Sequence, residues 1–485
     1  MAAQNNRQGS FEVFRFVFVV VVMLWSSMLF MSPWLLLFVP FLAGILSRFA
    51  MPERSLSFRL LLVLVICGCF GGLYGLASRP SAQAALPFYS DVLDGNIASG
   101  VKANLQALKI VPLMALLSAF LGGVIGETLP GGKKSPAIIA LVFLTLFSVN
   151  FFTSSLKMST TNFFESIGVL PPGSYTFDGH VYTNAFHHMK SGVPYYQAIH
   201  RALSERQGNA PIRSVLNIRP PFPFFLWMLL PPDGSFIALL FFVMASLLFF
   251  ASYFTMARLT NDPVLSLATP SMLGYLFVYA ISAGWFTISE YWAWFFLAAA
   301  LWARSRGLRV LFVLSFTFCL FTRELFFLPL ILFLLDGLLR KDKREIGDCL
   351  IILTLSTVYY LTHFYLAWRH SLAGASSLPP FTLGHWLQGG TDFALGSYLF
   401  GSIFIFKPLL YGAVILILYA VAAVRIFRER LTPFYPLAAL PLAGLAFFFA
   451  GVSGLYYWGL LYLPALAYVV PAAFIQPPGP DGEVN

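Results

Sequence analysis

Residues 236–257 read FIALLFFVMASLLFFASYFTMA and contain no charged side chain. A helix of about 20 apolar residues is long enough to cross the hydrocarbon core of a bilayer, so this stretch predicts a membrane-spanning helix. The whole chain is similar, because 59% of its 485 residues are hydrophobic and only 10% are charged. Soluble proteins carry roughly a quarter charged residues. We therefore expect an all-α polytopic membrane protein.

Comparable apolar segments predict about 14 transmembrane or re-entrant helices. They cover residues 13–30, 34–49, 59–77, 108–127, 136–155, 236–257, 263–283, 286–303, 309–321, 324–338, 349–367, 398–423, 433–450 and 455–473. The chain then divides into N-terminal transmembrane helices (1–156), a large external loop (157–235), C-terminal transmembrane helices (236–475) and a disordered tail (476–485).

Basic residues predict the orientation, because cytoplasmic loops of membrane proteins hold most of the Lys and Arg. With the N-terminus inside, five basic clusters share the cytoplasmic side: Arg48/Arg54/Arg59, Lys133/Lys134, Arg304/Arg306/Arg309, RKDKRE from Arg340 and RIFRER from Arg425. Both termini are then cytoplasmic and loops 78–107, 157–235 and 368–397 are external. These clusters account for the net charge of +10, so no nucleic-acid partner is expected. The absence of an N-x-[ST] sequon favours a bacterial inner membrane.

The segments 309–321 and 324–338 are each shorter than a full span, yet both of their outer flanks are basic. A tight helical hairpin with Arg323 and Glu324 at its far side satisfies this pattern, and a single broken helix does not. Glu290 lies about one turn inside the outer end of its own helix. Ionisable groups at membrane depth are costly and usually functional. The alternative is an internal ion pair between Arg323 and Glu290 that holds helices together.

The second external loop, 157–235, is the longest polar stretch, and YTFDGHVYTNAFHHMKSGVPYYQAIHRAL (175–203) lies within it. Its apolar spacing predicts short helices along the outer membrane surface, with a break at 192–194. Asp178 beside an apolar surface could take a proton from a hydroxyl, and His180 and Tyr182 could bind a polar ligand. Asp178 could instead cap the following helix.

The loop offers no convincing metal site. His180, His187, His188 and His200 have neither a cysteine nor a second nearby carboxylate to complete a usual ligand set. We expect no metal and no other cofactor, although the sequence leaves open a divalent cation between Asp178 and a histidine.

Arg219 precedes the proline-rich stretch PPFPFFLWMLLPP, which fixes the backbone above the membrane. An arginine held there could bind a phosphate in bidentate fashion, or could be an interfacial residue without a ligand. The chain has no GxxxxGK[ST] motif and no GxGxxG motif that opens a soluble nucleotide-binding domain, which argues against ATP or a nucleotide-sugar donor. It also has no HExxH or GxSxG motif of hydrolases.

Three stretches together resemble the GT-C superfamily of integral-membrane glycosyltransferases, in particular its mannosyltransferase-like and aminoarabinose-transferase-like branches. They are DGHVYTNAFHHMKSGVPYY, RPPFPFFLWMLLP and LFTRELFFLPLILFLL, within about 157–340. The resemblance implies transfer of a sugar from a polyprenyl-phosphate donor to a hydroxyl of a glycan, lipid or protein, with inversion. Asp178 would be the base and Arg219 or Arg323 would stabilise the leaving phosphate.

In the same resemblance, Glu290, Glu324, His180 and Tyr182 would bind or orient the substrates, and Tyr196 could stack on a sugar. The family usually carries its acid in the first external loop, often as one of a pair, whereas about five spans precede Asp178 here. Two other classes stay open: a transporter or flippase of lipid-linked saccharides, and an arginine-dependent polymerase or ligase.

Overall fold

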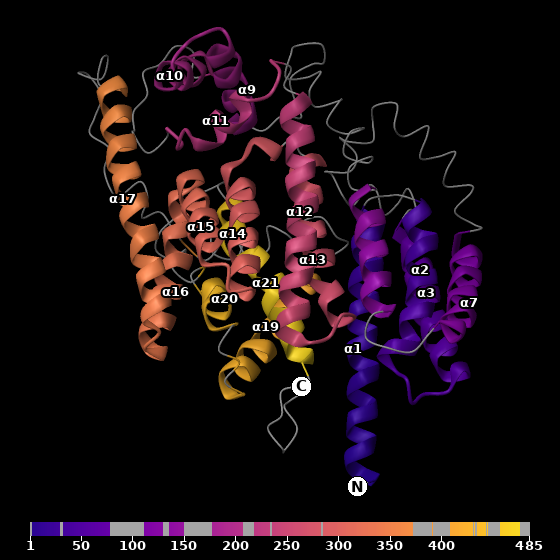
Figure 1. Ribbon diagram of the computed structural model, residues 1–485. Helices are drawn as coiled ribbons and strands as arrows, with labels where there is room; N and C mark the ends of the chain where they lie inside the picture. Colours follow the sequence, from indigo (N-terminus) through magenta and orange to yellow (C-terminus); the bar gives the residue numbers. More distant parts are fainter. Residues whose placement is uncertain are drawn as a thin grey trace.

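The computed structural model shows a helical protein (Figure 1). It describes residues 2–29, 33–77, 111–129, 135–149, 177–206, 218–232, 235–282, 285–371, 390, 408–429, 431, 434–442, 444 and 456–475. Within these ranges every regular element is an α- or 3-10 helix, which confirms the all-α class. The tail 476–485 lies outside the described residues.

One group of helices comes from the N-terminal third of the chain and stands at the right in Figure 1. It contains α1 (Ala2–Leu29), α2 (Pro33–Ala50), α3 (Leu56–Ala77), α7 (Val111–Thr128) and the helix Ser135–Val149. Helix α1 also packs against α13 of the second group, so the two groups share one core.

The second group is the C-terminal body. Its elements are α12 (Ser235–Thr260), η2 (Leu265–Leu267), α13 (Ala268–Ser282), η3 (Trp285–Thr287), α14 (Ser289–Ser305), α15 (Arg309–Thr322), η4 (Glu324–Phe326), α16 (Phe327–Arg340), α17 (Lys343–Ser371), α19 (Pro408–Arg428), α20 (Tyr435–Ala439), η10 (Tyr456–Leu461), α21 (Leu463–Val469) and η11 (Val470–Phe474). Helices α15 and α16 form the hairpin that their charge pattern predicts, with Arg323 and Glu324 at the turn.

Three short helices form a cap over one end of the body, at the top of Figure 1. They are α9 (Phe177–Lys190), α10 (Tyr195–Arg206) and α11 (Phe222–Met228). The predicted break lies between α9 and α10, where Gly192 adopts a φ of 91° that disfavours other residues. Lys190 ends α9 and donates to the carbonyl of Met228 at 2.9 Å, which ties α9 to the end of α11.

Among the described residues, two helical segments are long and apolar enough to span a membrane, Phe236–Thr260 and Lys343–His370, and six shorter apolar helices accompany them. Helix α17 exposes Leu350, Leu355, Val358 and Leu361, each at 47% or more of its accessible surface. A continuous apolar face of this kind is typical of a helix in contact with lipid. The full set of about 14 spans stays a prediction.

Helix α17 begins earlier than its hydropathy predicts, at Lys343 and not near 349. The reason is a local cap: Asp342 Oδ1 accepts hydrogen bonds from the backbone N–H groups of Arg344 at 3.0 Å and Glu345 at 3.2 Å. A capping carboxylate starts a helix within polar sequence, so hydropathy alone placed the boundary too late.

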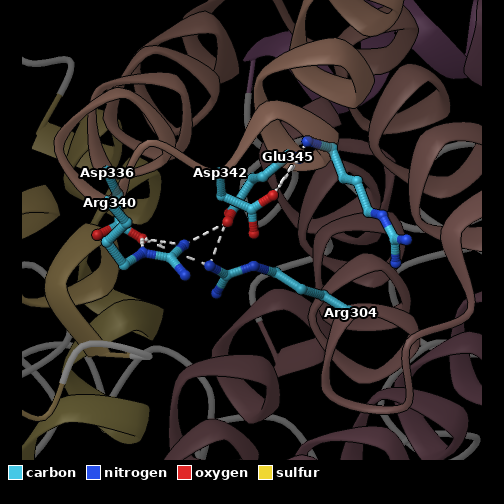
Figure 2. A network of polar contacts seen from close by, with 6 residues as sticks. Arg304, Asp336, Arg340, Asp342 and Glu345 are labelled. Atoms are coloured by element: carbon cyan, nitrogen blue, oxygen red, sulfur yellow. Dashed lines mark hydrogen bonds and ion pairs between the residues drawn. The ribbon is translucent and has the colours of Figure 1, made fainter.

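A network of charges joins three helix ends at the end of the body opposite the cap (Figure 2). Arg304 of α14 lies 2.6 Å from Glu345 of α17 and 3.4 Å from Asp336 of α16. Arg340 lies 2.7 Å from Asp336 and also contacts Glu345. Because two arginines share two acids, the ends of α14, α16 and α17 are held together.

Helices α2 and α7 approach so closely that backbone touches backbone. A Cβ added at Gly122 would collide with the carbonyl oxygen of Phe41, and one at Gly126 would lie 3.1 Å from Cα of Ile45. Residue numbers increase together along this contact, so the two helices are parallel. Small residues spaced by four are a common means of packing helices in membranes.

We expect Gly122→Ala to lower the midpoint of thermal unfolding, because overpacking a close contact costs about 1–3 kcal/mol. Gly347→Ala is the matched control, since a Cβ there meets nothing within 4 Å. It should leave the midpoint unchanged or raise it slightly. Equal midpoints for the two purified variants would contradict this packing.

Candidate functional site

The candidate site lies where the cap meets the body, and a buried ion pair forms its floor. Arg323 Nη2 lies 2.9 Å from Oε1 of Glu290, and only 1% and 2% of these side chains are exposed. Ser289 donates to Oε2 of Glu290 at 3.1 Å. Arg323 Nη1 also lies 3.1 Å from Oε1 of Glu324. One guanidinium therefore joins two carboxylates from different elements.

Local structure explains why these charges meet. Glu290 is in the first turn of α14, where the helix dipole favours a negative charge. Arg323 is extended, with φ −153° and ψ 122°, so the chain leaves α15 there before η4 begins. The alternative interpretation of the sequence, an internal pair between Arg323 and Glu290, is thus confirmed as geometry.

Arg219 enters the site from the loop before α11. Its Nε donates to the hydroxyl of Tyr182 at 3.0 Å, and its own carbonyl accepts from the hydroxyl of Tyr195 at 2.5 Å. The neighbouring carbonyl of Ile218 lies 3.1 Å from Nε2 of His363. The cap and α17 thus hold the backbone of Arg219 on both sides, in addition to the prolines that follow it.

Glu324 stands between two arginines, and 33% of its side chain is exposed. The guanidinium groups of Arg323 and Arg219 both interact electrostatically with its carboxylate. The named groups form an alternating set of two arginines and two glutamates, which can orient a polar ligand and stabilise charge that develops on it.

Tyr196 is beside this set and faces α17. Its hydroxyl lies 3.0 Å from Nδ1 of His363, and its ring stacks on His370 at 5.8 Å. Because Nε2 of His363 faces a carbonyl oxygen, Nε2 carries the hydrogen and Nδ1 accepts from Tyr196. Burial raises the pKa of Tyr196 to about 12, so the phenol stays protonated and can donate.

The structure thus brings together five of the residues singled out in the sequence, namely Glu290, Arg323, Glu324, Arg219 and Tyr182, with Tyr196 next to them. Asp178 and His180 belong to the first turn of α9, but their side chains lie outside the described residues. His363 was not singled out in the sequence. A histidine inside the apolar segment 349–367 is the signal that could have identified it.

Within the part of the chain that the structure describes, no group of three or more His, Cys, Asp or Glu side chains could hold a metal ion.

Searches of protein-family models, of curated proteins and of solved structures found no match to this chain.

The buried pair should act as a unit in stability. We expect Arg323→Gln to cost about 3–5 kcal/mol, because it leaves the buried Glu290 without its cation. The double variant Arg323→Gln/Glu290→Gln should be more stable than the sum of the single losses predicts. The measurement is chemical unfolding of all four proteins in mixed micelles.

Arg309→Gln is the control, because Arg309 pairs with Asp348 at 2.6 Å while 55% of its side chain is exposed. Exposed pairs contribute little to stability. If the free energies of unfolding lost in the two single variants add up to the loss in the double variant, the buried pair is not a stabilising unit. Equal losses for Arg309→Gln and Arg323→Gln would show the same.

Proposed function

We propose that this protein is an integral-membrane glycosyltransferase that moves a sugar from a polyprenyl-phosphate donor to an acceptor hydroxyl outside the membrane. The observation that carries the proposal is the set Arg219, Arg323, Glu290 and Glu324 at the junction of cap and body. Guanidinium groups suit a phosphate, and ionised carboxylates can accept hydrogen bonds from sugar hydroxyls.

The separation of charged groups along α17 supports an external site. Glu345 belongs to the charge network at the end of the body opposite the cap, and the ring of His363 contacts the carbonyl of Ile218, next to Arg219. These residues are 18 positions apart in one helix, so they are about 27 Å apart along its axis. The hydrocarbon core of a bilayer is about 30 Å thick. A membrane that contains α17 would thus lie between the inner basic clusters and the cap.

The exposed face of α17 supports the same arrangement, because its large apolar side chains would contact lipid. The proposal places the protein in a bacterial inner membrane with both termini in the cytoplasm. It also keeps about 14 transmembrane or re-entrant helices arranged as in the GT-C superfamily.

The proposed reaction follows from these groups. Asp178 takes the proton of the acceptor hydroxyl, whose oxygen forms a bond to the anomeric carbon. The bond from that carbon to the phosphate oxygen breaks, and the polyprenyl phosphate leaves with the electron pair. Arg219 stabilises the charge that develops on the phosphate. Glu290 and Arg323 keep Glu324 in place, and Glu324, His180 and Tyr182 orient the sugar and the acceptor.

A second candidate is an arginine-dependent polymerase or ligase of lipid-linked glycans. The central position of Arg323 and the held backbone of Arg219 favour it. The two candidates differ in their dependence on Asp178, because only the transferase uses this carboxylate as a base.

The test is transfer of radiolabelled sugar from a panel of synthetic polyprenyl-phosphate sugars by the purified full-length protein, with membrane extract as the source of acceptor. We expect Asp178→Asn to slow turnover by about 10²–10⁴-fold, the usual contribution of a general base. Arg219→Gln should slow it by about 10²–10³-fold, as does loss of one charge-stabilising donor.

Glu205→Gln is the matched control, because it makes the same kind of change in the cap at a carboxylate that is 48% exposed and pairs with His188. It should retain wild-type turnover. If Asp178→Asn retains turnover while Arg219→Gln loses it, the arginine-dependent candidate replaces the transferase. If all three variants match the wild type, the site is assigned wrongly.

A further inference from the structure

A second polar site lies away from the cap, between the N-terminal helices and the body. A cavity of about 740 Å³ opens where the ends of α2, α7 and α12 meet the start of α3. Its charged lining residues are Arg15, Arg48, Arg59, Glu127 and Asp262. A cavity of this volume is in the range of pockets that hold small ligands.

Two of the three arginines have a carboxylate partner. Arg15 lies 2.6 Å from Oδ2 of Asp262, and Arg59 pairs with Glu127. Asp262 is fully used, because its Oδ1 accepts from the backbone N–H groups of Val264 and Leu265 at 2.9 Å each. The acids of this cavity are therefore occupied by arginines and by backbone, which disfavours a cation site.

Arg48 is bound differently. Its Nη1 donates to the carbonyl oxygens of Gly126 at 2.6 Å, Glu127 at 2.5 Å and Leu129 at 2.7 Å, at the end of α7. Among the described residues, no carboxylate lies within ion-pair distance of Arg48. Three arginines and two acids line the cavity, so the described lining carries one more positive than negative charge.

Two buried hydrogen-bond donors at the cavity also lack acceptors. The Nε atoms of Arg15 and Arg59 are buried and have no hydrogen-bond partner among the described residues. Arg59 as a whole is only 4% exposed. A buried N–H without an acceptor costs free energy that an oxygen-rich anion could recover.

We infer that this cavity binds a phosphate group, held by Arg48 with Arg15 and Arg59 beside it. Guanidinium groups match the geometry and charge of phosphate oxygens, and each hydrogen bond to them is charge-assisted. The cavity lies at the end that carries the basic clusters, where the headgroups of anionic lipids collect at a cytoplasmic membrane surface. A lipid headgroup and free inorganic phosphate offer the same chemistry, and the experiment separates them. The inference does not depend on the proposed transferase activity.

The test is the midpoint of thermal unfolding of the delipidated full-length protein in detergent. Four additions are compared: phosphatidylglycerol, phosphatidylcholine, inorganic phosphate, and chloride at the ionic strength of the phosphate. We expect phosphatidylglycerol or inorganic phosphate to raise the midpoint, and phosphatidylcholine and chloride to leave it unchanged. A rise with phosphatidylglycerol alone supports a lipid ligand, and a rise with inorganic phosphate supports a soluble one.

Arg48→Gln should raise the concentration of the phosphate compound at which the shift is half-maximal by about tenfold or more, as expected for loss of a charge-assisted contact. It keeps an amide donor for the end of α7, and Arg48→Lys, which keeps the charge, should weaken binding less. Arg54→Gln is the matched control, because it removes a positive charge from the turn that follows α2, six residues after Arg48, and Arg54 does not line the cavity.

Three results would overturn the inference. They are no rise with either phosphate compound, an equal rise with phosphatidylcholine, and equal weakening by Arg48→Gln and Arg54→Gln. Should Arg48→Gln unfold without ligand, Arg48→Lys and Arg15→Gln against Arg54→Gln decide the same question.

Discussion

The buried ion pair between Glu290 and Arg323 is the constraint on which the half of the structure next to the cap depends. Two charges that are almost fully removed from solvent are tolerated only when they meet each other with good geometry. The pair forms where α14 starts at Ser289 and α15 ends at Thr322. The chain continues through η4 into α16 from this point, so the pair lies at the turn of the short hairpin.

Charged side chains are also paired at the opposite end of the body. Arg304, Asp336, Arg340 and Glu345 neutralise one another where α14, α16 and α17 end. Between the two sets of charges, the helices present apolar side chains inward and outward alike. Among the described residues of the body, charge gathers at these two levels, and the cap brings Arg219, Tyr182 and Tyr196 to the level next to it.

Much of this could be predicted from the sequence, because it depends on local pattern. Hydropathy predicted helices where α1, α2, α3, α12 and α17 lie, the basic flanks of 309–338 predicted the hairpin, and Gly192 with Pro194 predicted the break in the cap. Interactions between distant segments could not be predicted in the same way. The bond from His363 to Ile218 joins residues 145 positions apart, and no local pattern indicates it. The role proposed for Asp178 rests on its place in the polar loop and on the resemblance of the surrounding sequence.

The measurement that tests the account most directly is the side of the membrane on which each charged level lies. In a cysteine-free background, Ser191→Cys would mark the exposed turn between α9 and α10, and Ser57→Cys would mark the start of α3. A membrane-impermeant thiol reagent is then applied to sealed vesicles of each orientation. The account predicts that right-side-out vesicles label only Cys at position 191 and inverted vesicles only Cys at position 57. Labelling of both positions from the same side would contradict it.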